Sequence, residues 1–166
     1  EPKIFIKEPM PEVFVVEFTG KLVAITPPTP PLVPDVNGNM LLKAIDAATV
    51  GSAHYEADES KQCIGFWTGA TDVVSWKFDL KRLGNYAVQI EYACEDDTAG
   101  SEVEITIGGK PISFTVAGTG SWSRFSTVEV GSVGLAKTGI VTVSVKASKM
   151  KGFAVMNLRS VKLTAK

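Results

Sequence analysis

Hydrophobic and polar residues alternate with a period of two over much of the chain. The alternation is clearest in four segments, at 73–78, 86–92, 103–107 and 141–145. A period of two puts the apolar side chains on one face of a strand, so each segment is predicted to be a half-buried β-strand. Glycine-containing turns separate the predicted strands, at 83–85, 108–109, 118–120 and 138–139. Short strands between such turns predict an all-β fold, an antiparallel β-sandwich.

The alternation changes phase inside the last predicted strand. Ala154, Met156 and Leu158 occupy even positions, whereas Val161 and Leu163 occupy odd positions. One strand buries both sets only if an extra residue is inserted, which predicts a β-bulge near Arg159-Ser160. Residues 40–50 leave a helix open as the alternative to strand.

Proline divides the chain into two parts. Eight of the nine prolines lie in the first 34 residues, most of them in the stiff run 27–34. Before this run, residues 13–18 and 22–25 are predicted to form two short strands. We expect residues 1–39 to be an arm and connector, which packs on the following domain or ends a preceding module, and residues 40–166 to be the sandwich. The start at Glu1 suggests a fragment or a processed product.

Composition excludes several classes of function. A net charge of −1 gives no reason to expect nucleic-acid binding, and no apolar run is long enough to span a membrane. The single histidine, His54, has no nucleophile motif beside it and is expected in a surface or polar loop, which argues against hydrolytic and multi-histidine metal chemistry. Cys63 and Cys94 are compatible with one disulfide or with two buried thiols.

Five short motifs in a fixed order resemble a galactose-binding-like jelly roll of the family-six carbohydrate-binding-module type. They are Cys63–Trp67, Val73–Phe78, Gly84–Val88, Thr119–Val128 and Ala154–Val161. The variant is similar to modules appended to bacterial alpha-L-fucosidases, and the resemblance covers about residues 40–166.

The resemblance implies a sugar cleft between loops at one end of the sandwich. Phe66 and Trp122 would be the two rings that grip the sugar, and Asn157 the amide that binds its hydroxyls. Each has another interpretation: Phe66 as a core residue, Trp122 as an indole buried under a loop, and Asn157 as the cap of a backbone group at the bulge.

No cofactor is expected. The resemblance allows a structural calcium, but its usual pair of glutamates is missing from residues 42–46, where only Asp46 offers a carboxylate. The acidic turn 95–97 is the other candidate, with a simply solvated turn as the alternative.

Charge is distributed unevenly along the chain. Residues 46–104 hold twelve acidic and four basic residues, whereas every charged residue after Glu129 is basic. Lys149, Lys151 and Arg159 bracket Asn157, which suggests the hypothesis that the cleft prefers an anionic sugar. The alternative is that these bases pair with acidic neighbours across the sheet.

The function expected from these features is non-catalytic. The chain would be a carbohydrate-binding accessory module, covalently linked to a secreted or periplasmic glycan-degrading enzyme that it holds on its polysaccharide. A structural β-sandwich packed on a catalytic domain, without a ligand of its own, is the alternative. An enzyme is the weakest hypothesis, because no convergent acid, base or nucleophile is evident.

Overall fold

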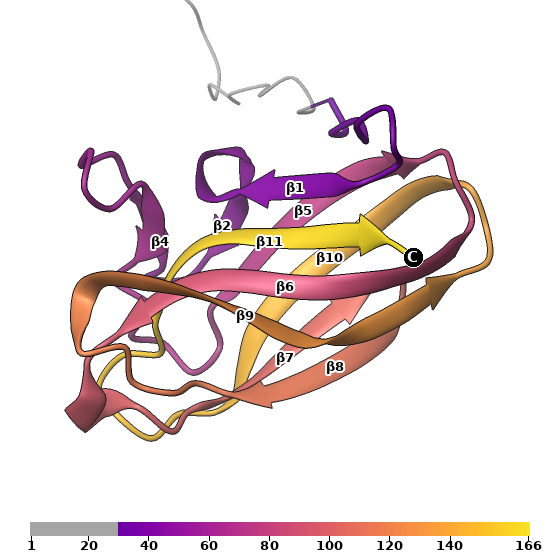
Figure 1. Cartoon of the computed structure of the whole chain (residues 1–166). Coiled ribbons are helices and arrows are strands. Elements are labelled where there is room, and N and C mark those ends of the chain that lie inside the picture. The colour runs from indigo at the N-terminus through magenta and orange to yellow at the C-terminus, as the bar shows by residue number, and fades with distance from the viewer. Residues whose placement is uncertain (1–29) are drawn as a thin grey trace, which may run out of the picture.

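Two antiparallel sheets face each other in the computed structural model, which describes residues 30–166 (Figure 1). The predicted all-β antiparallel sandwich is therefore confirmed. The strands expected at 13–18 and 22–25 lie outside the described residues. The elements are β1 (Met40–Lys43), η1 (Ala44–Asp46), β2 (Ala48–Val50), β3 (His54–Glu56), β4 (Cys63–Gly65), β5 (Val73–Leu80), β6 (Gly84–Cys94), η2 (Asp96–Thr98), β7 (Glu102–Ile107), β8 (Lys110–Thr115), β9 (Ser121–Leu135), β10 (Gly139–Lys149) and β11 (Asn157–Ala165).

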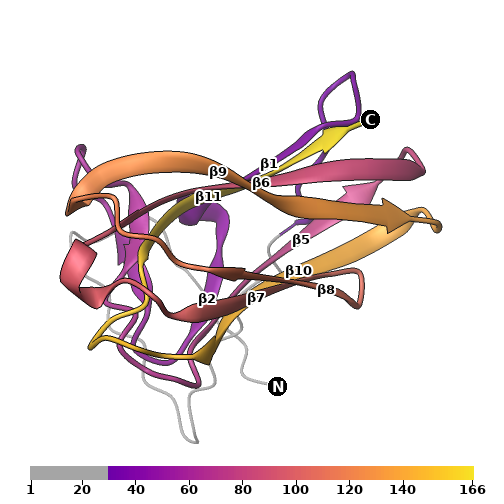
Figure 2. The same cartoon turned by 60° about the horizontal axis from the view of Figure 1, so that its bottom comes forward.

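One sheet has the strand order β3-β4-β11-β6-β9, with β1 also paired to β11, and the other has the order β2-β5-β10-β7-β8. Figure 2 shows the two layers nearly edge-on. Within residues 30–166, no helix is long and apolar enough to cross a membrane.

The core lies between the two sheets and follows the alternation in the sequence. In β5, Val74, Trp76 and Phe78 are buried while the residues between them are more exposed. Two buried aromatic residues of the core have their polar groups paired: the Trp76 indole Nε1 donates to the Lys43 carbonyl at 2.8 Å, and the Tyr86 hydroxyl donates to the Arg82 carbonyl at 2.6 Å. Residues 40–50 form two strands around a single 3₁₀ turn instead of an α-helix.

The predicted bulge lies in β11. Its register against β6 shifts between Leu158 and Ser160, so Arg159 is the inserted residue. Leu158 and Val161 are both fully buried, which is what the phase change required. The bulge directs the Arg159 side chain across the sheet, where its guanidinium pairs with Glu91 at 2.9 Å.

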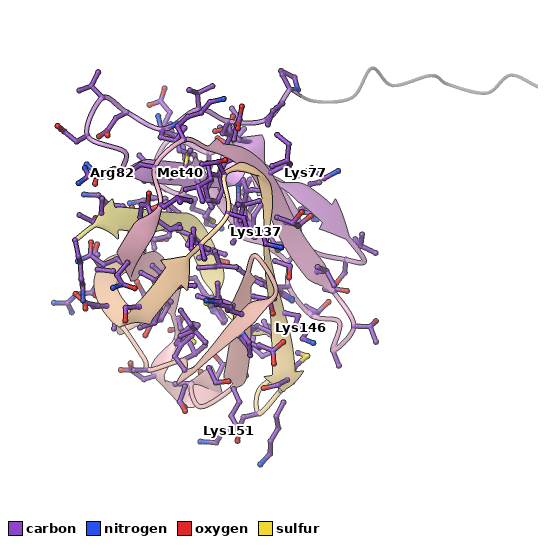
Figure 3. All side chains as sticks on the ribbon, turned by 90° about the vertical axis from the view of Figure 1, so that its right-hand side faces the viewer. Met40, Lys77, Arg82, Lys137, Lys146 and Lys151 are labelled. Carbon is purple, nitrogen blue, oxygen red and sulfur yellow. The ribbon has the colours of Figure 1, made fainter. Side chains whose placement is uncertain are left out.

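The basic C-terminal strands pair with acidic residues of neighbouring strands. Lys146 lies 3.1 Å from Glu104, and Lys149 lies 3.6 Å from Glu102, both between β10 and β7. Figure 3 shows Lys137, Lys146 and Lys151 spread over the molecule and not gathered in one patch. Cross-strand pairing, that of Arg159 included, therefore accounts for three of the seven basic residues after Glu129.

Candidate functional site

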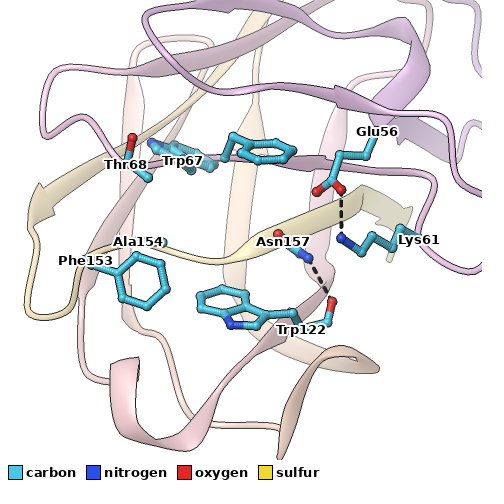
Figure 4. Close-up of a pocket in the computed structure, with 9 residues that line it drawn as sticks. Glu56, Lys61, Trp67, Thr68, Trp122, Phe153, Ala154 and Asn157 are labelled. Atoms are coloured by element: carbon cyan, nitrogen blue, oxygen red, sulfur yellow. Dashed lines mark hydrogen bonds and ion pairs between the residues drawn. The ribbon is translucent and has the colours of Figure 1, made fainter.

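A cleft of about 200 Å³ opens among the loops at one end of the sandwich. Figure 4 shows its lining, which combines aromatic rings with a small set of polar side chains. The nine lining residues are Glu56, Lys61, Phe66, Trp67, Thr68, Trp122, Phe153, Ala154 and Asn157. All three residues predicted from the sequence, Phe66, Trp122 and Asn157, are among them.

Strand β6 explains why Trp122 and Asn157 meet although they are 35 positions apart. The first residue of β11, Asn157, pairs with Ala93 on one side of β6, and the first residue of β9, Ser121, pairs with Cys94 on the other side. The Asn157 amide then bridges the two strand ends, because its Nδ2 donates to the Trp122 carbonyl at 2.8 Å. Asn157 thus binds a backbone group, but that group belongs to Trp122 near the start of β9 and not to the bulge in β11.

Trp122 is half-buried and packs against the core on one side. Its other neighbour is Phe153, whose ring meets the indole edge to face with centroids 5.8 Å apart. The indole is thus neither fully exposed nor covered by a loop, and part of its surface lines the cleft.

Phe66 lies on the surface and not in the core. It adopts a left-handed backbone conformation with φ of +52°, which is uncommon for a bulky residue and is seen most often at functional sites. The ring is 58% exposed and stacks on the His54 ring at 4.5 Å with an interplanar angle of 9°. His54 is exposed on β3, as predicted, and supports the Phe66 ring.

Trp67 follows Phe66 and, unlike its neighbour, is fully buried. The Trp67 carbonyl accepts a hydrogen bond from the Val155 backbone N–H at 2.9 Å, which ties the β4–β5 loop to the β10–β11 loop. The Trp67 indole Nε1 is the one buried side-chain polar atom in residues 30–166 without a partner. Packing therefore holds the ring, and its edge forms part of the cleft floor.

Phe153 is a cleft residue that the sequence analysis missed. It lies in the β10–β11 loop, is 68% exposed and packs edge to face on the Trp122 indole. The available signal was its position after Lys151-Gly152 and four residues before Asn157, the same kind of polar, glycine-containing loop that precedes Trp122.

Glu56 and Lys61 form the polar end of the cleft and were also missed. The Glu56 carboxylate and the Lys61 ammonium are 2.7 Å apart, and the two side chains are only 14% and 30% exposed. Arg159 holds this loop in place: its Nε donates to the Lys61 carbonyl and its Nη2 to the Ser60 carbonyl, both at 2.9 Å. The bulge in β11 therefore positions Lys61 at the cleft, a link that sequence spacing cannot show.

Asp72 anchors the loops behind Phe66. Its buried carboxylate accepts hydrogen bonds from the backbone N–H groups of Ser52, Ala53 and Gly69, and from the Ser52 hydroxyl at 2.6 Å. Burial by itself would raise the pKa of Asp72, but these hydrogen bonds, the one from the Ser52 side chain foremost, outweigh burial and lower the pKa. Asp72 therefore stays ionised and fixes the base of the β4–β5 loop.

The two cysteines are buried free thiols, which decides between the alternatives that the sequence left open. Burial, together with the nearby Glu56 carboxylate, raises the pKa of Cys63 to about 12. A thiol with so high a pKa is protonated at neutral pH and is a poor nucleophile.

Metal-binding clusters are absent from the part of the chain that the structure describes: no three histidine, cysteine, aspartate or glutamate side chains lie close enough to hold an ion. In the acidic turn, Asp96 instead accepts a hydrogen bond from the Gly120 backbone N–H at 3.0 Å. The cleft itself offers rings for an apolar face and oxygen and nitrogen atoms for hydroxyl groups, a combination suited to binding a sugar.

Solved structures with a similar fold include three carbohydrate-binding modules. A family 35 module from Clostridium thermocellum has a TM-score of 0.62 at 18% identity, over 77% of this chain and 98% of that one. A C-terminal family 6 module of a laminarinase from Zobellia galactanivorans has a TM-score of 0.61 at 16% identity, over 76% and 98%. A family 6 module of a lichenase from Cellvibrio mixtus, in complex with cellotriose, has a TM-score of 0.61 at 17% identity, over 76% and 97%.

At these identities the likeness shows a shared jelly-roll fold, in agreement with the resemblance of the motifs. A search of curated protein sequences found no match. One family model, described as a domain of unknown function (DUF5077), matches residues 49–166, which include all of the cleft-lining residues. The chain therefore belongs to the DUF5077 family.

Proposed function

We propose that this chain is a non-catalytic carbohydrate-binding domain that holds a sugar in the cleft beside Trp122. The observation that carries the proposal is the convergence of Phe66, Trp122 and Asn157, from three separate loops or strand ends, on one open cleft. The apolar C–H face of a pyranose stacks on an aromatic ring, and its hydroxyls find polar partners at the rim of the cleft.

The size of the cleft suits a small ligand. About 200 Å³ is less than the space that drug-sized ligands usually occupy, so the cleft suits a ligand as small as a single sugar ring. The shared fold with modules such as the cellotriose-bound one from the Cellvibrio mixtus lichenase supports the same function.

The wider context is also part of the proposal. The resemblance of the motifs to modules of bacterial alpha-L-fucosidases supports a covalent link to a secreted or periplasmic glycan-degrading enzyme. In that setting the domain would raise the local concentration of the enzyme on its polysaccharide and would need only weak affinity for each site.

A structural sandwich without a ligand is the competing function, favoured by the half-buried state of Trp122 and by its packing on Phe153. A pure scaffold, however, gives no reason for Phe66 to adopt a strained backbone and remain 58% exposed. The two functions differ in whether the isolated domain binds glycans.

Glycan-array binding followed by calorimetry tests the proposal, with Trp122→Ala as the variant. Loss of the indole face should weaken binding by at least about tenfold, equivalent to 1.4 kcal/mol. Circular dichroism checks that the variant stays folded, and Leu83→Ala provides a control, because Leu83 is an exposed apolar residue at the other end of the sandwich. Equal binding by wild type and Trp122→Ala would rule out the cleft as the sugar site.

A further inference from the structure

The polar end of the cleft presents acceptor oxygens. The Asn157 amide has a fixed orientation, because its Nδ2 is engaged by the Trp122 carbonyl. Its Oδ1 therefore faces Gly65, where a Cβ atom would lie 3.1 Å away. The Glu56 Oε1 lies beside Gly65 as well, only 1.8 Å from the position that a Cβ atom on Gly65 would take. The missing side chain at Gly65 thus lets a carboxylate and an amide oxygen lie on the same side of the strand.

Lys61 is the only basic residue among the nine that line the cleft, and it is already paired. Its ammonium lies 2.7 Å from the Glu56 carboxylate, and this hydrogen bond raises the pKa of Lys61, so that the ion pair persists at neutral pH. An ammonium has three donors, so Lys61 can still donate to a neighbouring hydroxyl while its charge is balanced.

The basic residues that bracket Asn157 in the sequence are engaged elsewhere or lie outside the lining. Arg159 pairs with Glu91, and its guanidinium also lies 3.4 Å from the centre of the Phe125 ring. Lys149 pairs with Glu102 on the opposite sheet. Neither residue, nor Lys151, lines the cleft.

From this geometry we propose that the cleft selects neutral, polyhydroxylated sugars over uronic or sulfated ones, with Glu56 as the specificity-determining residue. One sugar hydroxyl donates to Glu56 or to the Asn157 Oδ1, and an adjacent hydroxyl accepts from Lys61. A sulfate or carboxylate has only acceptor oxygens, so it would leave these acceptors unpaired and would face the Glu56 charge. The inference rests on the proposed function and gives its ligand class.

The direct test changes Glu56 to glutamine. The probes are an array with matched neutral, sulfated and uronic oligosaccharides, and the measured quantity is the ratio of neutral to anionic binding. The wild type should prefer the neutral member of each pair by about tenfold or more. In Glu56→Gln, Lys61 loses its counter-charge, so the ratio should fall by about tenfold and anionic binding should strengthen at low salt.

A second variant moves the carboxylate without removing it. In Gly65→Ala, the new methyl group would overlap the end of the flexible Glu56 side chain, which must shift away from Gly65 while the net charge stays the same. The neutral-to-anionic ratio should fall here too. Glu104→Gln is the matched control, because it breaks an ion pair with Lys146 on the other sheet and should leave the ratio unchanged.

The outcomes distinguish a failure of the neutral-sugar inference from a failure of the proposed sugar binding. Wild-type preference for sulfated or uronic glycans, or an unchanged ratio in a folded Glu56→Gln variant, would overturn the neutral-sugar inference while leaving sugar binding intact. Failure of the folded wild type to bind any glycan would instead overturn the proposed function.

Discussion

The two ends of the sandwich both have a hollow, and the two hollows differ in chemistry. The hollow at the far end, between the β7–β8 and β9–β10 turns, is the larger at about 660 Å³, against about 200 Å³ for the cleft. Its lining contains three glycines, two lysines and no aromatic ring. The smaller cleft concentrates four rings, an ion pair and an amide. The volume of a hollow therefore says less about ligand binding than the kinds of side chain that line it.

Loop length explains the difference between the ends. At the far end, β7 and β8 are joined by two residues, and β9 and β10 by three. At the cleft end, the β4–β5 and β10–β11 connections have seven residues each. Tight turns are built from glycine and polar residues, whereas longer loops have room to project large side chains over a rigid scaffold.

The largest effect should come from the residue that anchors the cleft loops. Asp72→Ala removes the acceptor for four hydrogen bonds, most of them from backbone groups, and should lower the free energy of unfolding by about 3 kcal/mol. Urea denaturation measures the loss. Amide hydrogen exchange should become faster first around residues 51–53 and 66–69, whereas the exchange rates of the far-end turns should stay unchanged.

Asp79→Ala is the matched control for that experiment. Asp79 is the next-to-last residue of β5, near the far end, and forms a surface ion pair with Lys81, whose loss should cost less than about 1 kcal/mol. If the two variants were equally destabilised, the special role of Asp72 at the cleft end would be wrong.

Acid should weaken the cleft end through the same residue. The pKa of Asp72 is lowered in the folded protein, so its ionised form contributes stability at pH values above its unfolded pKa, near 4. That contribution is lost as the pH falls through the folded pKa. The wild type should thus lose stability below about pH 4 more steeply than Asp72→Asn, as measured by urea denaturation at a series of pH values. Parallel curves would contradict the prediction.

A moderate effect on binding is expected from Phe153→Ala. The Phe153 ring supports the Trp122 indole edge to face and extends the apolar wall of the cleft. Its removal should weaken sugar binding by about threefold to tenfold, or 0.5–1.5 kcal/mol, with less effect on stability because the ring is 68% exposed. Calorimetry with an oligosaccharide identified on the array measures the change, and unchanged affinity would exclude Phe153 from the site.

The smallest effect is expected at the far end. Ile140 is 58% exposed and lines the larger hollow. Ile140→Ala should leave glycan affinity unchanged and stability within about 0.5 kcal/mol. A loss of binding in this variant would place the ligand at the far end and overturn the comparison.

Local pattern was enough to predict five of the eleven strands in residues 30–166, and the bulge in the last of them. Alternation identified β5, β6, β7 and β10, and the phase change located the inserted Arg159, because burial on one face imposes the same period on sequence and structure. The motifs also identified three residues, Phe66, Trp122 and Asn157, that the fold brings to one cleft. Whether they bind sugar remains a prediction.

The rest depended on side chains that meet only in three dimensions. The sequence shows that basic residues follow acidic ones, but only strand register shows that Lys146 faces Glu104 and that Arg159 faces Glu91. Glu56 and Lys61 meet because a short hairpin and the Arg159 contacts bring them together, and Phe153 reaches Trp122 from a different loop. Periodicity reports which face of a strand is buried, whereas the charge and reach of a loop side chain depend on partners that lie far away in the sequence.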